Sequence, residues 1–391
     1  MYSKFPFLLI YPPFIYGALP VFFYSYFGYQ LSPSLDHRLL SLVDLFGSLI
    51  IAIFFLNYKR LAVSSGLFER FQFIFSRPLF SCLIILSCLV LVFEGWKSVE
   101  LIQQGFDRDD LKEFGRVSAL FLVLGSLACF FLAGALWLDS KMKYALLFGV
   151  LGAMLITASR SEILLVAYFV YILLFFSGPI NYKKYILYII AVLFAGSFFT
   201  ILVQGRGGGV IIALEKFFQY RTTSLFLAEY SISEAAKSPD IIFPFLGRYY
   251  DQMANLFGSR STISSSFHID YVYMGYNEKY GYHMWANVVY PWWSWFYGYF
   301  GLSGFLFKFS FISFLLWFFV NLRFYFTFVF FMVSLVWISQ TVHPLLSSKH
   351  AYLFLFLFII DLIFVLRVLL VKMLQSRRRI IAELSDIGAG K

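Results

Sequence analysis

The chain has 391 residues, of which 61% are hydrophobic and only 13% are charged, and its formal net charge is +10. A soluble domain usually carries about 25% charged residues, so this composition excludes a water-soluble fold and a separate soluble enzyme domain. The three cysteines, Cys82, Cys88 and Cys129, lie inside apolar runs without the paired spacing of a disulfide framework or a zinc site. We therefore expect an integral membrane protein with no metal bound at its cysteines.

Ten segments are apolar over about 20 residues, the length that crosses roughly 30 Å of hydrocarbon. The first lacks a small-residue cleavage site after its apolar core, so we expect a retained helix and not a signal peptide. The pattern predicts an all-α integral membrane protein with about ten transmembrane helices. Their expected ranges are 7–28, 39–57, 79–96, 117–138, 144–158, 163–177, 185–203, 298–320, 324–342 and 351–371.

The basic residues set the expected orientation. With a cytoplasmic N-terminus, the basic connections 59–77, 139–143 and 181–184 and the turn at Arg323 all face the cytoplasm, as the positive-inside rule requires. Both termini are then cytoplasmic, and the arginine run of the tail indicates contact with anionic membrane lipids and not with nucleic acid. The expected regions are transmembrane helices 1 to 7 at 1–203, an extracytoplasmic loop at 204–297, helices 8 to 10 at 298–371 and a basic cytoplasmic tail at 372–391.

The large loop between helices 7 and 8 is expected to be structured. Its net charge is near zero, and residues 210–236 predict an amphipathic helix lying against the bundle. The stretch 259–285 is rich in hydroxyls, aromatic rings and histidines. Such a surface suits sugars, and it is equally typical of a membrane-interface belt. The apolar residues at helical spacing are Ile211, Leu214, Phe218, Leu225 and Phe226.

Arg160 is the first candidate for anion binding. It lies in a Ser-Arg-Ser turn between two expected helices at the outer membrane surface. An arginine at membrane depth costs about 2.5–3.5 kcal/mol on insertion scales and needs an anionic partner or a ligand. Its planar fork suits a phosphate or pyrophosphate. A structural ion pair with Glu162 or Glu94 is the alternative.

Further cations follow in the large loop. Arg206 lies in the glycine-rich run QGRGGGV after the seventh helix, where backbone amides can approach an anion closely. A flexible helix exit explains the same glycines. Arg221, Arg248 and Arg260 are additional candidates, and a solvated or structural charge is the alternative for each.

Two loop histidines, His268 and His283, are the candidate catalytic bases, because a neutral imidazole can take a proton from an acceptor hydroxyl. Asp270 would orient the His268 ring if the segment is extended. His343 and His350, at the last outer turn, are weaker candidates.

Two carboxylates lie inside expected helices, Asp44 in the second and Asp361 in the tenth. Intramembrane acids can couple proton or ion transport. Because these two stand alone, without broken-helix repeats, we expect structural hydrogen bonds instead.

The chain resembles a known family in several features. These are the helix layout, the Ser-Arg-Ser turn at 159–161, the large outer loop between late helices and the aromatic segment ANVVYPWWSWFYGYFGLSGFLFKF at 286–309. Together they resemble bacterial O-antigen and capsule repeat-unit polymerases of the Wzy type, which are related in layout to O-antigen ligases.

The resemblance implies a GT-C-like membrane glycosyltransferase in the bacterial inner membrane, with its active site facing the periplasm. It would join undecaprenyl-pyrophosphate-linked glycans, one as donor and one as acceptor, without a metal or other cofactor. A chain-length regulator protein would be a further partner. Carried onto this sequence, Arg160 and Arg206 would bind the pyrophosphate, a loop histidine would activate the acceptor hydroxyl, and Arg221, Arg248 and Arg260 correspond only loosely to the family's loop arginines.

Other functions stay open at this point. An O-antigen ligase would use the same donor with lipid A core as its acceptor. A transporter or flippase of lipid-linked glycan would need a cationic central cavity, whereas most basic residues here lie at helix ends and in the loop. A polyprenyl-phosphate-sugar transferase usually has acidic residues in its first outer loop, where this chain has only Asp36.

Overall fold

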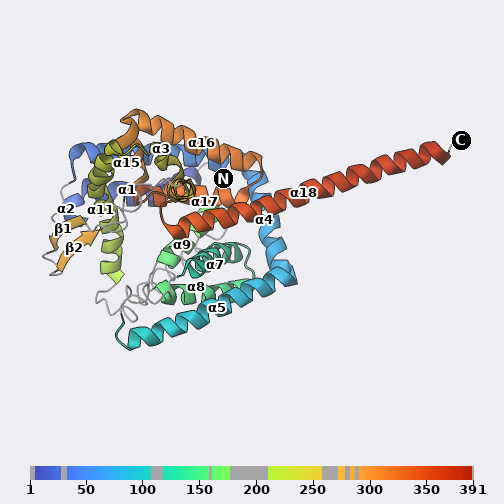
Figure 1. The fold of residues 1–391 in the computed structure, drawn as a ribbon, viewed down its shortest axis with the longest axis horizontal. Coiled ribbons are helices and arrows are strands. Elements are labelled where there is room, and N and C mark those ends of the chain that lie inside the picture. Colours follow the sequence, from blue (N-terminus) through green and yellow to red (C-terminus); the bar gives the residue numbers. More distant parts are fainter. Residues whose placement is uncertain are drawn as a thin grey trace.

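The computed structural model describes residues 5–27, 33–106, 118–157, 161–176, 210–257, 272–277, 282–286 and 290–389. Within these residues, five helices are long and apolar enough to cross a membrane. They are α3 (Leu35–Asn57), α5 (Pro78–Gln103), α7 (Ala119–Trp137), α16 (Ser303–Asn321) and the Ser348–Ser376 part of α18 (Ser348–Ala389). The chain is therefore a helical membrane protein. Figure 1 shows how its helices are arranged.

Shorter apolar helices complete the bundle. They are α1 (Phe5–Phe22), α2 (Tyr24–Phe27), α8 (Met142–Thr157), α9 (Ser161–Phe176) and α17 (Tyr325–Val336), the last followed by the 3-10 turn η2 (Ile338–Gln340). Helices occupy every expected span that the structure describes, and the span expected at 185–203 lies outside the described residues. The number of membrane crossings and the GT-C-like arrangement stay predictions.

The aromatic helix α17 forms the centre of the bundle. All of its residues are buried, and it packs against α3, α9, α16 and α18. A helix that is apolar on every face is stable only when other helices surround it. Its rings interlock with neighbouring helices: Phe326 lies 4.7 Å from Phe71 and 5.1 Å from Phe130 between ring centres.

Glycines bring α5 and α8 into backbone contact. A Cβ atom at Gly152 would lie 2.5 Å from the Leu91 carbonyl oxygen, and one at Gly95 would lie 2.7 Å from the Gly152 carbonyl oxygen. Small residues are the usual means of close helix approach in membranes, where lipid supplies no hydrophobic drive between helices. The α5–α8 pair depends on the absence of side chains at these positions.

The helix α4 (Arg60–Ser76) crosses one end of the bundle, between the ends of α3 and α5 (Figure 1). The sequence predicts this stretch as part of a polar connection at 59–77. The structure differs because Val63, Leu67, Phe71 and Ile74 form an apolar face that is buried against the bundle. The basic residues of the stretch 59–77 therefore lie on or beside a helix that is packed against the bundle, and not in an irregular connection.

A buried ion pair ties α4 to α18. Arg70 donates to a carboxylate oxygen of Asp361 and to the Arg323 carbonyl. Asp361 also accepts hydrogen bonds from the Thr327 backbone N–H and hydroxyl, both at 2.8 Å. The expected structural role of Asp361 is thus confirmed, and its charge is satisfied by fixed donors.

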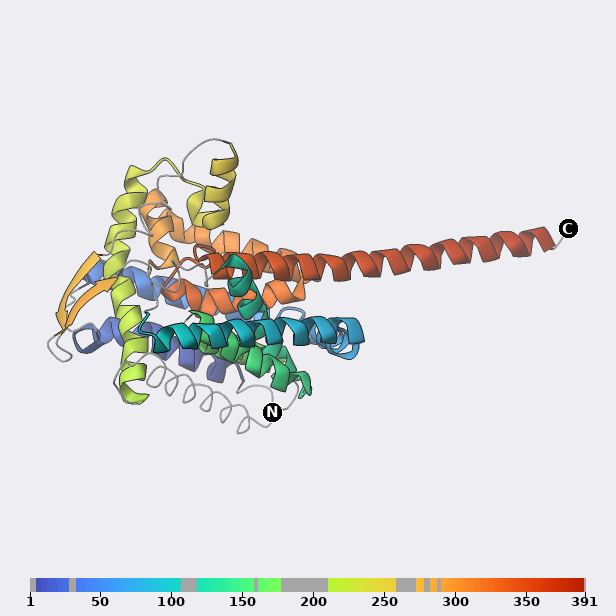
Figure 2. The same cartoon turned by 60° about the horizontal axis from the view of Figure 1, so that its bottom comes forward.

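The elements of the region 210–300 gather at the opposite end of the bundle (Figure 2). The helix α11 lies across that end, far from the projecting C-terminal part of α18, and it extends the predicted 210–236 helix by one residue. The antiparallel strands form a hairpin beside it, which the sequence does not predict. The elements are α11 (Val210–Lys237), α12 (Phe243–Leu246), α13 (Arg248–Leu256), β1 (Val272–Asn277), β2 (Tyr282–Ala286) and α15 (Trp292–Phe300).

The substitution Gly152→Ala should destabilise the protein by about 1–3 kcal/mol, because the new methyl group meets backbone that cannot move aside. In an ordinary helix the same change stabilises by about 0.5–1 kcal/mol. The sign of the change in stability therefore shows whether α5 and α8 are in backbone contact. The measurement is the thermal unfolding midpoint in detergent. Leu89→Ala on α5, a side chain that is 60% exposed, is the control and should have little effect. An unchanged or raised midpoint for Gly152→Ala would contradict the close packing.

Candidate functional site

A buried ion pair joins α3 and α16. Lys308 Nζ donates to Asp44 Oδ1, and both side chains are fully buried. The ammonium also lies 5.2 Å from the centre of the Trp292 ring, a distance at which a cation is attracted to the ring face. Because an unpaired charge at such a site costs several kcal/mol, each of the two groups requires the other.

Arg221 on α11 is fully buried beside this pair. Its terminal nitrogens donate to the Ser41 hydroxyl, the Gln340 carbonyl oxygen and, at 3.2 Å, the Ser224 hydroxyl. Ser41 precedes Asp44 by three residues on α3, so the two lie on one helix face. Arg221 interacts electrostatically with both Asp44 and Lys308. The five residues Ser41, Asp44, Arg221, Lys308 and Gln340 form what we name the α11 polar cluster.

Several polar atoms of the α11 polar cluster have no hydrogen-bond partner among the described residues. They are Arg221 Nε, Asp44 Oδ2 and both side-chain amide atoms of Gln340, all on fully buried side chains. Roughly nine in ten buried polar groups in folded proteins are hydrogen-bonded, and an unsatisfied one costs about 1–3 kcal/mol. The cluster thus offers both donors and acceptors that suit a charged or polar ligand.

His343 anchors the connection after α11 to the bundle. It lies fully buried in the turn before α18, where Nε2 is 3.0 Å from the Pro244 carbonyl oxygen and Nδ1 accepts from the Leu345 backbone N–H at 3.1 Å. Burial lowers the pKa of His343 to about 3. The ring is therefore neutral with both nitrogens engaged, which makes it a structural residue and not a base.

Trp292 connects His343 to the α11 polar cluster. Its ring centre lies 5.4 Å from that of His343, and its Nε1 donates to the same Pro244 carbonyl at 2.8 Å. The same Trp292 ring also contacts the Lys308 ammonium. The tryptophan run that begins α15 therefore fixes the position of the cluster's cation.

The candidate base His283 lies exposed on the hairpin, opposite Tyr276 in the strand register. Its Nδ1 is 2.9 Å from the Tyr273 hydroxyl, and its ring centre lies 5.0 Å from that of Tyr276. Which partner donates depends on the ring tautomer. When Nδ1–H donates to Tyr273, Nε2 carries the lone pair that can accept a proton. The three side chains form an aromatic cluster on the hairpin, and the hairpin lies beside α11 (Figure 2).

Arg248 opens α13 and is partly buried. Its backbone N–H donates to the Leu345 carbonyl at 3.0 Å, which ties α13 to the turn that holds His343. The side-chain Nε is buried without a hydrogen-bond partner among the described residues. Of the candidate cations, Arg221 and Arg248 therefore both present an unused guanidinium donor.

Five candidates, His268, Asp270, Arg160, Arg206 and Arg260, lie outside the described residues. Glu162 and Glu94, the expected alternative partners of Arg160, both form ion pairs with lysines. Glu162, only 2% exposed, accepts from Lys349 at 2.7 Å, and Glu94 accepts from Lys97 at 2.8 Å.

Sequence reasoning missed Lys308, Gln340 and Arg70. The signal for Lys308 is its position within the apolar run FLFKFSF, since a lysine inside a membrane helix needs a partner. Pairing it with Asp44 on another helix was a possible inference from the same principle. Arg70 and Gln340 carry no comparable signal, because Arg70 lies in the stretch expected as a polar connection at 59–77. Gln340 lies near the end of the helix expected at 324–342, where an uncharged polar residue is common.

Among the described residues, no group of three or more histidine, cysteine, aspartate or glutamate side chains is arranged to hold a metal ion. No family model, curated protein or solved structure matches the chain. Any assignment of function therefore rests on the residues themselves and on their geometry.

Removing one partner of the buried pair should strongly destabilise the protein. Lys308→Ala leaves Asp44 uncompensated and should cost about 3–5 kcal/mol, whereas the double variant Lys308→Met with Asp44→Asn should recover most of that loss. The matched control is Lys237→Ala, whose pair with Glu234 is exposed and should contribute less than about 1 kcal/mol. Thermal unfolding in detergent measures all three. Equal losses in Lys308→Ala and Lys237→Ala would show that the pair is not buried.

Acid should destabilise the fold through His343. Its pKa is about 3 in the folded chain and about 6.5 in the unfolded chain, so the unfolded state binds the extra proton between these values. Stability should fall as the pH drops from 6.5 towards 3, by up to about 1.4 kcal/mol per pH unit. Thermal unfolding across this window should show a smaller decline for His343→Gln, which cannot titrate. Parallel curves for the two proteins would rule out a buried neutral histidine.

Proposed function

We propose that the chain is a glycosyltransferase that polymerises undecaprenyl-pyrophosphate-linked oligosaccharide repeat units at the outer face of the bacterial inner membrane. The observation that carries the proposal is the α11 polar cluster, which holds two buried cations and polar atoms without a hydrogen-bond partner among the described residues. The aromatic hairpin lies beside α11, the helix that carries Arg221 (Figure 2). An anion-binding interior next to an aromatic surface suits a substrate that is half pyrophosphate and half sugar.

The cations suit the leaving group. As the glycosidic bond to the lipid breaks, negative charge develops on the pyrophosphate, and fixed cations in a dry site stabilise it by several kcal/mol. Arg221 and Arg248 each keep an unused Nε–H donor among the described residues, and a guanidinium binds phosphate oxygens bidentately. Arg160, Arg206 and Arg260 are assigned to the same task by the family resemblance alone.

The hairpin suits the acceptor sugar. Tyr273 and Tyr276 present exposed rings of the kind that stack on the apolar face of a pyranose. His283 beside them would take the proton from the attacking hydroxyl through Nε2, with Tyr273 holding Nδ1–H. His268, oriented by Asp270, is the other candidate base. In this proposal the arginines replace the metal ion that other transferases use.

One observation favours a second candidate function, transport of a lipid-linked glycan. The sequence places most basic residues at helix ends, but Lys308 and Arg221 lie buried inside the bundle beside Asp44. A cationic interior is what a flippase of an anionic lipid requires. An O-antigen ligase would share the donor site and differ only in its acceptor.

The test is a gel of surface polysaccharide from cells with and without the gene. Deletion should leave lipid A core bearing a single repeat unit, and the wild-type gene should restore the long ladder. Loss of all repeat units from the surface would favour the ligase or flippase, and an unchanged ladder would overturn the proposal.

Single variants sharpen the same assay. His283→Ala should lower polymer formation about 100-fold or more if this histidine is the base, and Arg160→Ala and Arg206→Ala should abolish long chains. Each variant protein must remain in the membrane fraction at the wild-type level. Lys237→Ala, which removes an exposed side chain at the C-terminal end of α11, should restore a normal ladder. A normal ladder with His283→Ala would leave His268 as the base.

A further inference from the structure

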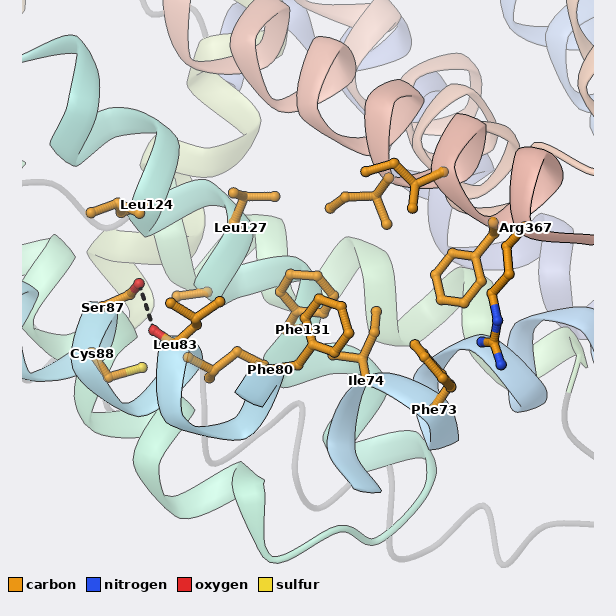
Figure 3. A pocket seen from close by; sticks show the side chains of 15 residues that line it. Phe73, Ile74, Phe80, Leu83, Ser87, Cys88, Leu124, Leu127, Phe131 and Arg367 are labelled. Carbon is orange, nitrogen blue, oxygen red and sulfur yellow. Dashed lines mark hydrogen bonds between the residues drawn. The ribbon is translucent and has the colours of Figure 1, made fainter. Parts of the chain in front are cut away.

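An apolar groove lies between α4, α5, α7 and α18, at the bundle end that α4 crosses. Its volume is about 320 Å³, within the range of about 300–1,000 Å³ of small-molecule sites. Figure 3 shows hydrocarbon side chains converging on it from all four helices, among them Phe73, Leu83, Leu127 and Phe131. Ser87 also lines the groove, and its hydroxyl donates a hydrogen bond to the Leu83 carbonyl oxygen at 2.8 Å. The walls therefore suit a hydrocarbon ligand.

The groove opens on the outside of the bundle. Leu83 on α5 is 51% exposed and Ile363 on α18 is 59% exposed, although both contribute to its lining. The helices α5 and α18 stand on either side, each packed against α7. A ligand can thus enter from the surrounding lipid without any helix moving.

The shape of the groove follows the helix axes. Its lining runs from Phe80 to Cys88 on α5, from Leu124 to Phe131 on α7 and from Ile360 to Arg367 on α18. Each stretch covers eight or nine residues, which is roughly 12 Å of helix at 1.5 Å per residue. The space is therefore elongated along the direction in which lipid chains lie.

Positive charge is concentrated at one end of the groove. Arg367 is the only charged residue among its lining residues, and its guanidinium carbon lies 4.2 Å from the centre of the Phe73 ring. The Arg77 guanidinium carbon lies 5.2 Å from the same ring. Both arginines are exposed, and neither forms an ion pair with a carboxylate of the described residues. Two cations without a carboxylate partner in the described part of the chain therefore lie at one end of the groove.

We propose that this groove binds one acyl chain of an anionic glycerophospholipid, whose phosphate is held by Arg367 and Arg77. The hydrocarbon walls receive the chain, and the planar guanidinium groups match the phosphate oxygens. In the expected orientation Arg77 lies in a cytoplasmic connection and Arg367 lies near the cytoplasmic end of the tenth helix. Anionic lipids at that surface attract basic groups by about 1 kcal/mol each. The bound lipid fills the space between α5 and α18 and holds α4 against both. This site is independent of the proposed enzymatic function, because it lies at the opposite end of the bundle from the α11 polar cluster.

The test uses the full chain purified in a neutral detergent. Phosphatidylglycerol or phosphatidylcholine with identical acyl chains is added, and native mass spectrometry measures the lipid retained while thermal unfolding measures its effect on stability. Phosphatidylglycerol should be retained and should raise the unfolding midpoint more than phosphatidylcholine does. The double variant Arg367→Gln with Arg77→Gln should retain it at least about tenfold less well.

Two further variants separate the chain from the headgroup. Ser87→Leu fills the groove and leaves both arginines in place, and it should also lose the lipid. Lys237→Gln at the other end of the protein is the matched charge control and should retain the lipid like the wild type.

Several results would overturn the proposal. Equal retention of phosphatidylglycerol by all variants, or equal retention of the two lipids by the wild type, would exclude a site that recognises the phosphate. Displacement of phosphatidylglycerol by a lower concentration of undecaprenyl phosphate would assign the groove to a polyprenyl lipid. A dimer that Ser87→Leu dissociates would assign it to a second copy of the chain.

Discussion

The pairing of charges inside an apolar bundle is the constraint on which this structure depends. A buried ion loses its hydration at a cost of several kcal/mol, and only a close counter-charge with further hydrogen bonds offsets that cost. Three such pairs occur among the described residues, Lys308–Asp44, Arg70–Asp361 and Lys349–Glu162. Each joins helices that are far apart in the sequence. The hydrophobic effect is non-directional, whereas these pairs add a specific constraint on which helix faces which.

The two ends of the bundle satisfy this constraint to different degrees. At the α4 end, Asp361 receives hydrogen bonds from an arginine, a hydroxyl and backbone amides. At the α11 end, Arg221, Asp44 and Gln340 retain polar atoms without partners among the described residues. A fully satisfied polar network rigidifies a core, and a partly satisfied one leaves binding capacity. Chemistry with a charged substrate is therefore expected at the α11 end.

The sequence predicts most of this fold because hydropathy over 20 residues is a one-dimensional property, and helices lie at every described span. The helix spacing of Leu214, Phe218 and Leu225 likewise identified α11. The sequence did not predict the buried role of Arg221, because a cation in a polar loop looks solvated until its neighbours from α3 and η2 are known. The helix α4 was missed because its buried stripe is short and interrupted by charges. The exposed position of His283 agrees with a candidate base, while the catalytic roles stay predictions.

The helix α18 is continuous from Ser348 to Ala389 and carries Lys349 near its start and Asp361 twelve residues later, about 18 Å along its axis. One stiff rod thus holds an ion pair with α9 near one face of the bundle and another with α4 towards the other face, and it continues well beyond the bundle (Figure 1). A rotation of this helix would strain both pairs together, since Lys349 and Asp361 are carried by the same continuous helix. The projecting end of α18 is therefore a mechanical lever, and a force applied there would reach the opposite face of the protein without passing through any flexible joint of the described helix.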